Sequence, residues 1–219
     1  MKERALLLVG SPHASGASAM LGAQLLDRLP TDRWDTHTLR IYPTLSSDDR
    51  WRELIDAVHG ADLIVLSAPL YVDALPAAVT RAFERLAAGP AVSGARPGQR
   101  FTVLMNCGFL EARQCEVALS ICNRFAREAG LQWAGGLSVG AAGRMTPYVQ
   151  EALDLAAAAL DAGDEVPSAA VALASKPPMP AWLYVVVASA FMWFEARKHG
   201  AHRRLGARPY VPAMGGGRE

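Results

Sequence analysis

Five short apolar runs, each separated from the next by an amphipathic stretch, constrain the fold of this chain more than any other feature. The runs cover residues 5–9, 36–41, 63–66, 101–105 and 131–139, and the one at 36–41 is the weakest. Continuous apolar runs bounded by turn residues are typical of strands buried on both faces of a parallel sheet. Apolar residues spaced three and four apart predict intervening helices over 17–29, 49–59, 76–88, 111–129 and 147–162. This alternation predicts an α/β fold with a doubly wound, five-stranded parallel sheet.

Composition and segment boundaries predict one folded domain with a C-terminal extension. The chain has 219 residues, of which 51% are hydrophobic and 20% are charged, as expected for a globular protein with a sizeable core. The stretch 166–180 is rich in Ala, Ser and Pro, which favours a linker. We therefore expect a domain over 1–165, followed over 166–219 by a linker, an apolar aromatic helix and a basic tail.

The C-terminal segment is apolar and rich in aromatic residues. Residues 177–194 contain no charged side chain, and basic residues follow them. A helix starting at Pro180 would be uncharged for only about 22 Å, against roughly 30 Å for the hydrocarbon core, so we do not expect it to span a membrane. An apolar helix must still be covered. Docking on the domain, pairing in a homo-oligomer such as a dimer, roofing a pocket, and peripheral membrane contact through 180–199 all stay open.

Charge and cysteine usage narrow the class of protein. Residues 1–175 hold 15 basic and 19 acidic side chains, whereas residues 176–219 hold 7 and 2. Without a basic stripe on the domain, nucleic-acid binding has little support. Three cysteines, Cys107, Cys115 and Cys122, lack paired spacing, which favours reduced thiols in a cytoplasmic protein, and we expect the last two in the core. His199 and His202 alone do not make a metal site.

The segment 10–18, Gly-Ser-Pro-His-Ala-Ser-Gly-Ala-Ser, joins the first predicted strand to the first helix. Backbone N–H groups at a helix N-terminus, together with the hydroxyls of Ser11, Ser15 and Ser18, suit an anion such as phosphate. An ordinary turn with serine capping is the alternative. The glycine spacing matches neither a Walker A motif nor GxGxxG, which argues against a nucleoside triphosphate or a dinucleotide in this loop.

A second unusual segment follows the third predicted strand and reads Ser-Ala-Pro-Leu-Tyr-Val-Asp-Ala-Leu-Pro over 67–76. A loop that only had to turn would use Gly, Asn or Asp. Two prolines and a tyrosine instead favour a stiff apolar surface for a flat group, and a loop that merely packs on the core is the alternative. Ligands on such sheets collect at the carboxyl ends of the strands, where this loop and the first one begin.

Together the two segments resemble the NAD(P)H-dependent FMN reductase family of flavodoxin-like proteins. The resemblance covers roughly residues 4–160 in element order, and its specific matches are Ser11-Pro12, Gly16, Ser18, Pro69-Leu70-Tyr71 and Pro76. It implies a flavodoxin-like sheet in the order 2-1-3-4-5, FMN as the cofactor and NAD(P)H as the co-substrate. In that family the first loop binds the FMN phosphate, and the loop after the third strand lies against the isoalloxazine ring.

The resemblance implies a site made of cofactor-binding residues, with no catalytic side chain and no metal. The implied residues are Ser11, His13, Ser15, Gly16, Ala17 and Ser18 at the phosphate, and Pro69, Leu70, Tyr71, Val72, Asn106, Cys107, Gly108 and Phe109 around the ring. The chain departs from the family at His13, where Arg is usual, and at Ala17, where Asn is usual. Losing a permanently charged donor predicts weaker or pH-dependent FMN binding. We interpret Cys107 as a bystander thiol.

The implied function is that of an enzyme, an FMN-dependent oxidoreductase. Hydride would pass from NAD(P)H through flavin N5 to a small acceptor such as a quinone, a nitro compound or free flavin. The alternative is a flavodoxin-like electron-transfer protein that docks a protein partner. Such carriers are strongly acidic, whereas residues 1–175 carry only four excess negative charges. A flavin-free structural or membrane-associated protein is the third hypothesis.

Overall fold

The computed structural model describes residues 2–88 and 96–207 and contains one five-stranded sheet, all of whose strand pairs are parallel. Its order, β2-β1-β3-β4-β5, is the one that the resemblance implied. The strands are β1 Glu3–Val9, β2 Trp34–Arg40, β3 Leu63–Pro69, β4 Arg100–Asn106 and β5 Gln132–Val139. Because β2 and β3 lie on opposite sides of β1, the winding direction reverses between β1 and β3.

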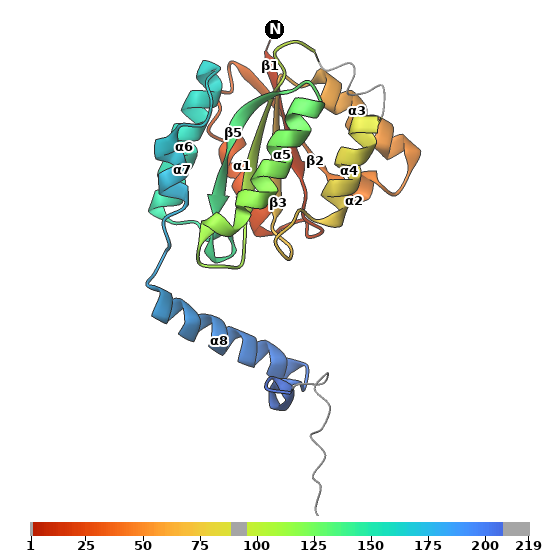
Figure 1. The fold of residues 1–219 in the computed structure, drawn as a ribbon. Helices are drawn as coiled ribbons and strands as arrows, with labels where there is room; N and C mark the ends of the chain where they lie inside the picture. Colours follow the sequence, from red (N-terminus) through yellow and green to blue (C-terminus); the bar gives the residue numbers. More distant parts are fainter. Residues whose placement is uncertain (1, 89–95, 208–219) are drawn as a thin grey trace, which may run out of the picture. The chain divides into compact units, whose positions relative to one another are not determined.

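Helices cover both faces of the sheet, and Figure 1 shows α6 and α7 on one side with α3 and α4 on the other. Apolar residues of α1, α6 and α7 make one core cluster with the sheet, and those of α3, α4 and α5 make the other. The helices are α1 Ala17–Leu26, α3 Asp48–Gly60, α4 Ala77–Ala88, α5 Glu116–Glu128, α6 Pro147–Ala162 and α7 Ser168–Ala174. Short turns complete this part of the chain: α2 Ile41–Thr44, η1 Ala112–Cys115 and η2 Ala141–Gly143.

Burial of the strands follows from their continuous apolar sequences. In β1, Leu6 and Leu8 enter one core cluster while Leu7 and Val9 enter the other, as alternating side chains of a strand must. All seven residues of β3 and of β4 are buried. The edge strand β2 is mostly exposed, which explains why its sequence gave the weakest signal.

Several predicted boundaries are wrong, each for a local reason. The helix predicted over 17–29 ends at Leu26, because a turn precedes Pro30. The stretch predicted as one helix over 111–129 begins as the 3-10 turn η1 before α5. The strand predicted over 36–41 lies at Trp34–Arg40, and Ile41 already starts α2.

The stretch that we expected to be a linker from residue 166 instead packs on the sheet domain. The Val166 amide donates to Ala134 O at 2.9 Å, and α7 buries Ala170 and Ala174 in the core. Small alanine side chains allow α7 to approach the sheet domain closely. The alanine-rich composition that suggested a linker is therefore explained by helix packing. The first compact unit accordingly runs over Met1–Pro178, beyond the predicted boundary at residue 165.

The second compact unit, Met179–Glu219, contains α8 Ala181–Lys198 and the short turn η3 His202–Arg204. The predicted apolar helix is therefore present, and it has no fully buried side chain. Across residues 2–88 and 96–207, no helix combines the length and apolarity needed to cross a membrane. The end of the predicted basic tail, 208–219, lies outside the described residues.

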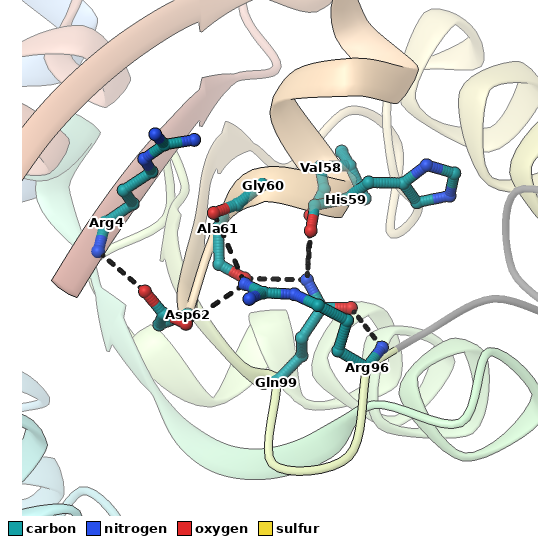
Figure 2. A network of polar contacts seen from close by, with 8 residues as sticks. All are labelled: Arg4, Val58, His59, Gly60, Ala61, Asp62, Arg96 and Gln99. Atoms are coloured by element: carbon teal, nitrogen blue, oxygen red, sulfur yellow. Dashed lines mark hydrogen bonds and ion pairs between the residues drawn. The ribbon is translucent and has the colours of Figure 1, made fainter.

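A polar network closes the C-terminal end of α3 at the amino-terminal edge of the sheet (Figure 2). The buried Gln99 amide donates to Val58 O at 2.8 Å and to Ala61 O at 2.6 Å, and its oxygen accepts from the Arg96 amide at 2.9 Å. The Arg96 guanidinium also donates to Ala61 O and to Asp62 Oδ1, each at 3.0 Å. One glutamine thus satisfies helix-end carbonyls that would otherwise lack partners.

The substitution Gln99→Leu should lower the free energy of unfolding by about 2–4 kcal/mol, because it leaves buried carbonyls without donors. Denaturant unfolding monitored by circular dichroism measures the change. Gln150→Leu, at an exposed position of α6, is the matched control and should change stability by less than about 0.5 kcal/mol. Equal effects of the two substitutions would contradict the role of Gln99.

Candidate functional site

The carboxyl ends of β1, β3 and β4 lie side by side and bring the three predicted loops to one edge of the sheet. Val9 pairs with Ser67, and Pro69 pairs with Asn106. The first residue after β1, Gly10, donates its amide to Ser67 O at 2.8 Å, and the Leu70 amide donates to Asn106 O at 2.7 Å. The winding reversal between β1 and β3 is where ligands of such sheets bind, so the geometry favours a site here.

The loop after β1 folds back on itself in front of α1. Ser11 Oγ accepts from the His13 amide at 3.2 Å and would lie 3.6 Å from a Cβ added at Gly16. Gly16 is the N-cap of α1 and supplies no side chain to cap the first-turn amides. Those amides and the exposed Ser15 therefore remain available to an anion, which the positive end of the helix dipole also favours.

Two of the predicted binding residues bond to each other inside the protein. The Ser18 hydroxyl is buried and donates to Asn106 Oδ1 at 2.7 Å. Ser67, also buried, donates its hydroxyl to Ser18 O at 2.6 Å. These bonds join α1 to the ends of β3 and β4. Because the Ser18 and Asn106 side chains already bond to each other, the remaining prediction for these two residues is that they contact a ligand through their backbone atoms.

The loop after β3 is a two-residue hairpin whose tip is exposed. The Tyr71 amide donates to Ala74 O at 2.9 Å, and the Ala74 amide donates back at 3.1 Å. Val72 and Asp73 both have left-handed backbones, with φ of 49° and 62°. A β-branched residue in this conformation is strained, and strain of this kind gathers at functional sites. Val72 is 96% exposed and does not obtain this conformation through packing.

The predicted apolar surface is narrower than the sequence suggested. Leu70 places its side chain in the hydrophobic core, and Pro69 is the last residue of β3 rather than part of the loop. Tyr71, which is 44% exposed, and Val72 are the large apolar side chains that the hairpin presents to solvent, beside the exposed Asp73 and Ala74. The alternative of a core-packing loop is therefore right for Leu70 and wrong for these two residues.

The loops after β4 and β5 interlock through their backbones. The Cys107 amide donates to Val139 O at 3.1 Å, the Ala142 amide donates to Cys107 O at 2.7 Å, and the Ala141 amide donates to Phe109 O at 2.6 Å. Ala141 and Ala142 have φ of 49° and 61°, again left-handed. Sequence reasoning missed this fourth loop, although the Gly-Ala-Ala-Gly sequence directly after a strand is a signal of irregular backbone.

Cys107 is buried beneath exposed loop residues Gly108 and Phe109. Its thiol lies 3.7 Å from Phe109 O and 3.7 Å from Glu111 O. A hydrogen bond from the Cys115 thiol lowers the pKa of Cys107 to about 7, against the opposing effect of burial. The predicted bystander thiol therefore has a partner that the sequence spacing did not reveal.

Arg40 and Tyr42, which sequence reasoning did not single out, also lie near these loops. The Arg40 guanidinium donates to Pro12 O at 2.7 Å, and its buried Nε has no partner among the described residues. Burial raises the pKa of Tyr42, and the nearby Tyr71 raises it further. Arg40 is the last residue of β2 and Tyr42 follows in α2, so the end of the edge strand brings a cation to the first loop and a phenol to the hairpin.

The serine hydroxyl that bonds Asn106 provides a direct test of this geometry. Ser18→Ala should lower the free energy of unfolding of the FMN-free protein by about 1–3 kcal/mol, because the buried Asn106 oxygen loses its donor. Ser15→Ala, in the exposed part of the same loop, is the control and should be nearly neutral. Denaturant titrations measure both. A neutral Ser18→Ala variant would show that the hydroxyl has no structural role.

Comparison with known proteins identifies a family whose sequence profile matches part of the chain. Residues 4–108, which include β1, β3, β4 and the loops after β1 and β3, match the sequence profile of the NADPH-dependent FMN reductases. No curated protein sequence matches the chain significantly. The family match thus covers about the first half of the chain and ends within the loop after β4.

Solved structures share the fold at low sequence identity. An FMN-dependent NADH-azoreductase from Bacillus anthracis, in complex with FMN, is 12% identical over 73% of this chain and 100% of its own, with a TM-score of 0.54. An NAD(P)H:quinone oxidoreductase from Methanothermobacter marburgensis is 15% identical over 74% and 97%, with a TM-score of 0.57. A flavodoxin from Streptococcus pneumoniae is 16% identical over 73% and 97%, with a TM-score of 0.55. At these identities the likeness establishes the fold alone.

Proposed function

Residues 4–108 belong to the NADPH-dependent FMN reductase family, and from this premise we propose that the chain is an FMN-dependent oxidoreductase that uses NAD(P)H. One observation carries the proposal. Within the matched residues, the open N-terminus of α1 and the exposed Tyr71 hairpin stand at neighbouring strand ends. An anion site beside an exposed aromatic side chain suits a ligand with a phosphate tail and a flat ring.

The first loop would hold the phosphate. The first-turn amides of α1 point along the helix axis toward the loop, and the Ser11 and Ser15 hydroxyls add polar groups beside them. His13 is exposed and can add positive charge when it is protonated. Backbone N–H groups would therefore bind the phosphate more than side chains would, which is consistent with the burial of the Ser18 side chain.

The hairpin and the loop after β4 would hold the ring. Tyr71 and Val72 offer exposed apolar surface, and the backbone of 106–109 would face the polar edge of the ring. When bound, FMN supplies the redox chemistry by accepting hydride from NAD(P)H and passing electrons to an acceptor. The chain's own contribution is to bind and orient the cofactor and limit solvent access, so we assign no side chain as acid or base.

We place a small molecule, such as a quinone, a nitro compound or free flavin, ahead of a protein as the electron acceptor. The shared fold does not decide between a small-molecule acceptor and a protein acceptor, because a flavodoxin resembles this chain as closely as the reductases do. Charge favours the enzyme: residues 1–175 carry only four excess negative charges, too few for a strongly acidic docking surface. The family match is also to reductases rather than to carriers.

Anaerobic titration of the FMN-loaded protein with NADH and with NADPH tests the proposal. We expect at least one of them to bleach the flavin absorption, and a quinone or a nitro compound to restore it within turnover. Bleaching by dithionite but by neither nicotinamide would instead support the electron carrier. Failure of the protein to bind FMN would overturn both.

Arg40 is a candidate source of the positive charge that His13 does not permanently supply. Its guanidinium donates to Pro12 O, inside the first loop, and its Nε is a buried donor without a partner among the described residues. A buried unpaired donor is costly, and an anion in the loop would relieve that cost by electrostatic attraction even without direct contact. We propose that Arg40 strengthens FMN binding.

Arg40→Leu should weaken FMN binding about tenfold, as expected for loss of one charge-assisted interaction. Isothermal titration or quenching of flavin fluorescence measures the dissociation constant. Arg127→Leu, at an exposed position near the C-terminal end of α5, is the control and should leave that constant unchanged. The double variant His13→Arg/Arg40→Leu should recover part of the affinity. Equal affinities of the two leucine variants would contradict the role of Arg40.

The apolar surface of α8 needs a partner that covers it. The helix is apolar on all sides up to residue 194, carries Trp182 and Trp193, and has Arg197 and Lys198 in its last turn, with further basic residues after it. A homo-oligomer contact would cover it, and so would the surface of an anionic membrane, which its basic end would attract. We propose that residues 180–199 make one of these two contacts in a cytoplasmic protein.

A further inference from the structure

The helix α8, drawn as one unbroken helix in Figure 1, exposes apolar side chains in every direction over residues 181–194. Successive residues turn by about 100° around a helix axis, so Trp182 and Val186 lie on one side, Phe191 on the opposite side and Met192 on a third. These four side chains are between 59% and 68% exposed. Residues 181–194 also contain no charged side chain, so this part of α8 has no charged side that would face water.

The chain reverses directly after α8 and brings two basic segments together. Gly200 has a left-handed backbone with φ of 67°, and the Ala201 amide donates to Ala196 O at 2.7 Å. The centroid of the His202 ring then lies 6.1 Å from that of the Trp193 ring, which places η3 beside the last turns of α8. Folding of this unit therefore puts the basic residues of η3 next to those of α8.

The charges at this end of α8 are mostly positive. Among the described residues 179–207, the sole acidic side chain is Glu195, and Lys198 forms an ion pair with it. Four basic side chains against one acidic side chain leave a net charge of +3 at one end of an otherwise uncharged helix. Clustered basic residues beside an apolar helix are typical of segments that bind anionic lipid headgroups. The four basic residues are all exposed: Arg197, Lys198, Arg203 and Arg204.

The distribution of apolar and charged side chains favours a lipid surface over a second copy of α8. Packing two helices together covers one side of each, and α8 would still expose apolar side chains on its other sides. Charge does not favour self-pairing either, since residues 181–194 offer no acidic side chain to the basic end of a partner helix. An anionic bilayer surface instead supplies apolar chains around an embedded helix and negative headgroups for its basic end.

We propose that α8 and η3 bind the surface of a membrane that contains anionic lipids. Residues 181–194 would lie at the boundary between the headgroups and the acyl chains, where Trp182 and Trp193 suit the headgroup layer. The basic residues of α8 and η3 would contact lipid phosphates. This inference selects one of the two partners left open for α8, and it does not rest on flavin binding, so its failure leaves the oxidoreductase proposal unchanged.

Co-sedimentation of the full-length protein with lipid vesicles tests the proposal. One set of vesicles is pure phosphatidylcholine, and the other also contains phosphatidylglycerol. We expect binding at least about tenfold tighter to the anionic vesicles, and weaker binding at high salt. Tryptophan fluorescence should shift to shorter wavelength on binding. The variant Trp182→Phe/Trp193→Phe should still bind but lose that shift, because its other tryptophans lie in the sheet domain.

Charge variants separate the basic end of α8 from the rest of the chain. Arg203→Gln/Arg204→Gln should weaken binding to the anionic vesicles about thirtyfold, which corresponds to about fivefold for each basic residue near the surface. Arg81→Gln/Arg127→Gln removes the same charge from exposed positions of α4 and α5. This matched control should bind as the wild type does. Equal losses in the two variants would overturn the assignment to α8 and η3.

An apolar variant and the oligomeric state distinguish lipid from a second copy of the chain. Phe191→Ala should weaken vesicle binding, because it removes exposed apolar surface from α8. Light scattering without vesicles measures the oligomeric state of the same proteins. A stable oligomer that Phe191→Ala dissociates would overturn the proposal in favour of a second copy. Absence of vesicle binding, or equal binding to both kinds of vesicle, would also overturn it.

Discussion

Parallel pairing of five strands is the constraint on which the rest of this structure depends. Backbone hydrogen bonds between β1 and β3, and between β3 and β4, align the carboxyl ends of these strands at one edge. β2 and β3 lie on opposite sides of β1, so the winding direction reverses at that edge, which is where ligands of such sheets bind. The proposed cofactor site is a consequence of strand order before any side chain is considered.

Side chains and strained backbone then give this edge its local form. The bond between Ser18 and Asn106 joins α1 to β4, while Val72 and Ala142 adopt left-handed conformations that ordinary loops avoid. The amino-terminal edge shows the contrast, since the Gln99 network there satisfies the end of α3. At the amino-terminal edge the end of α3 is thus satisfied, whereas the carboxyl edge retains strained backbone and, at Arg40, a buried donor without a partner in the described chain.

The sequence predicted the fold closely and the site only in outline. Continuous apolar runs identify β1, β3 and β4, because strands buried on both faces tolerate few polar residues. The run at 131–139 also identifies β5, an edge strand that is only partly buried. The pattern was weakest for β2, whose side chains are mostly exposed, and misleading for 166–174, where an alanine-rich helix resembles a linker. The loops were found by their unusual composition, but composition does not tell which of their side chains are buried.

Sequence by itself determined the α/β class, the succession of elements and the resemblance to FMN reductases, because periodicity and short motifs are local properties. Only the tertiary structure decided that Ser18 bonds Asn106 and that Arg40 supports the first loop. Each of these contacts joins residues from different elements. Their distances depend on how helices pack on the sheet, and spacing along the chain does not encode that packing directly.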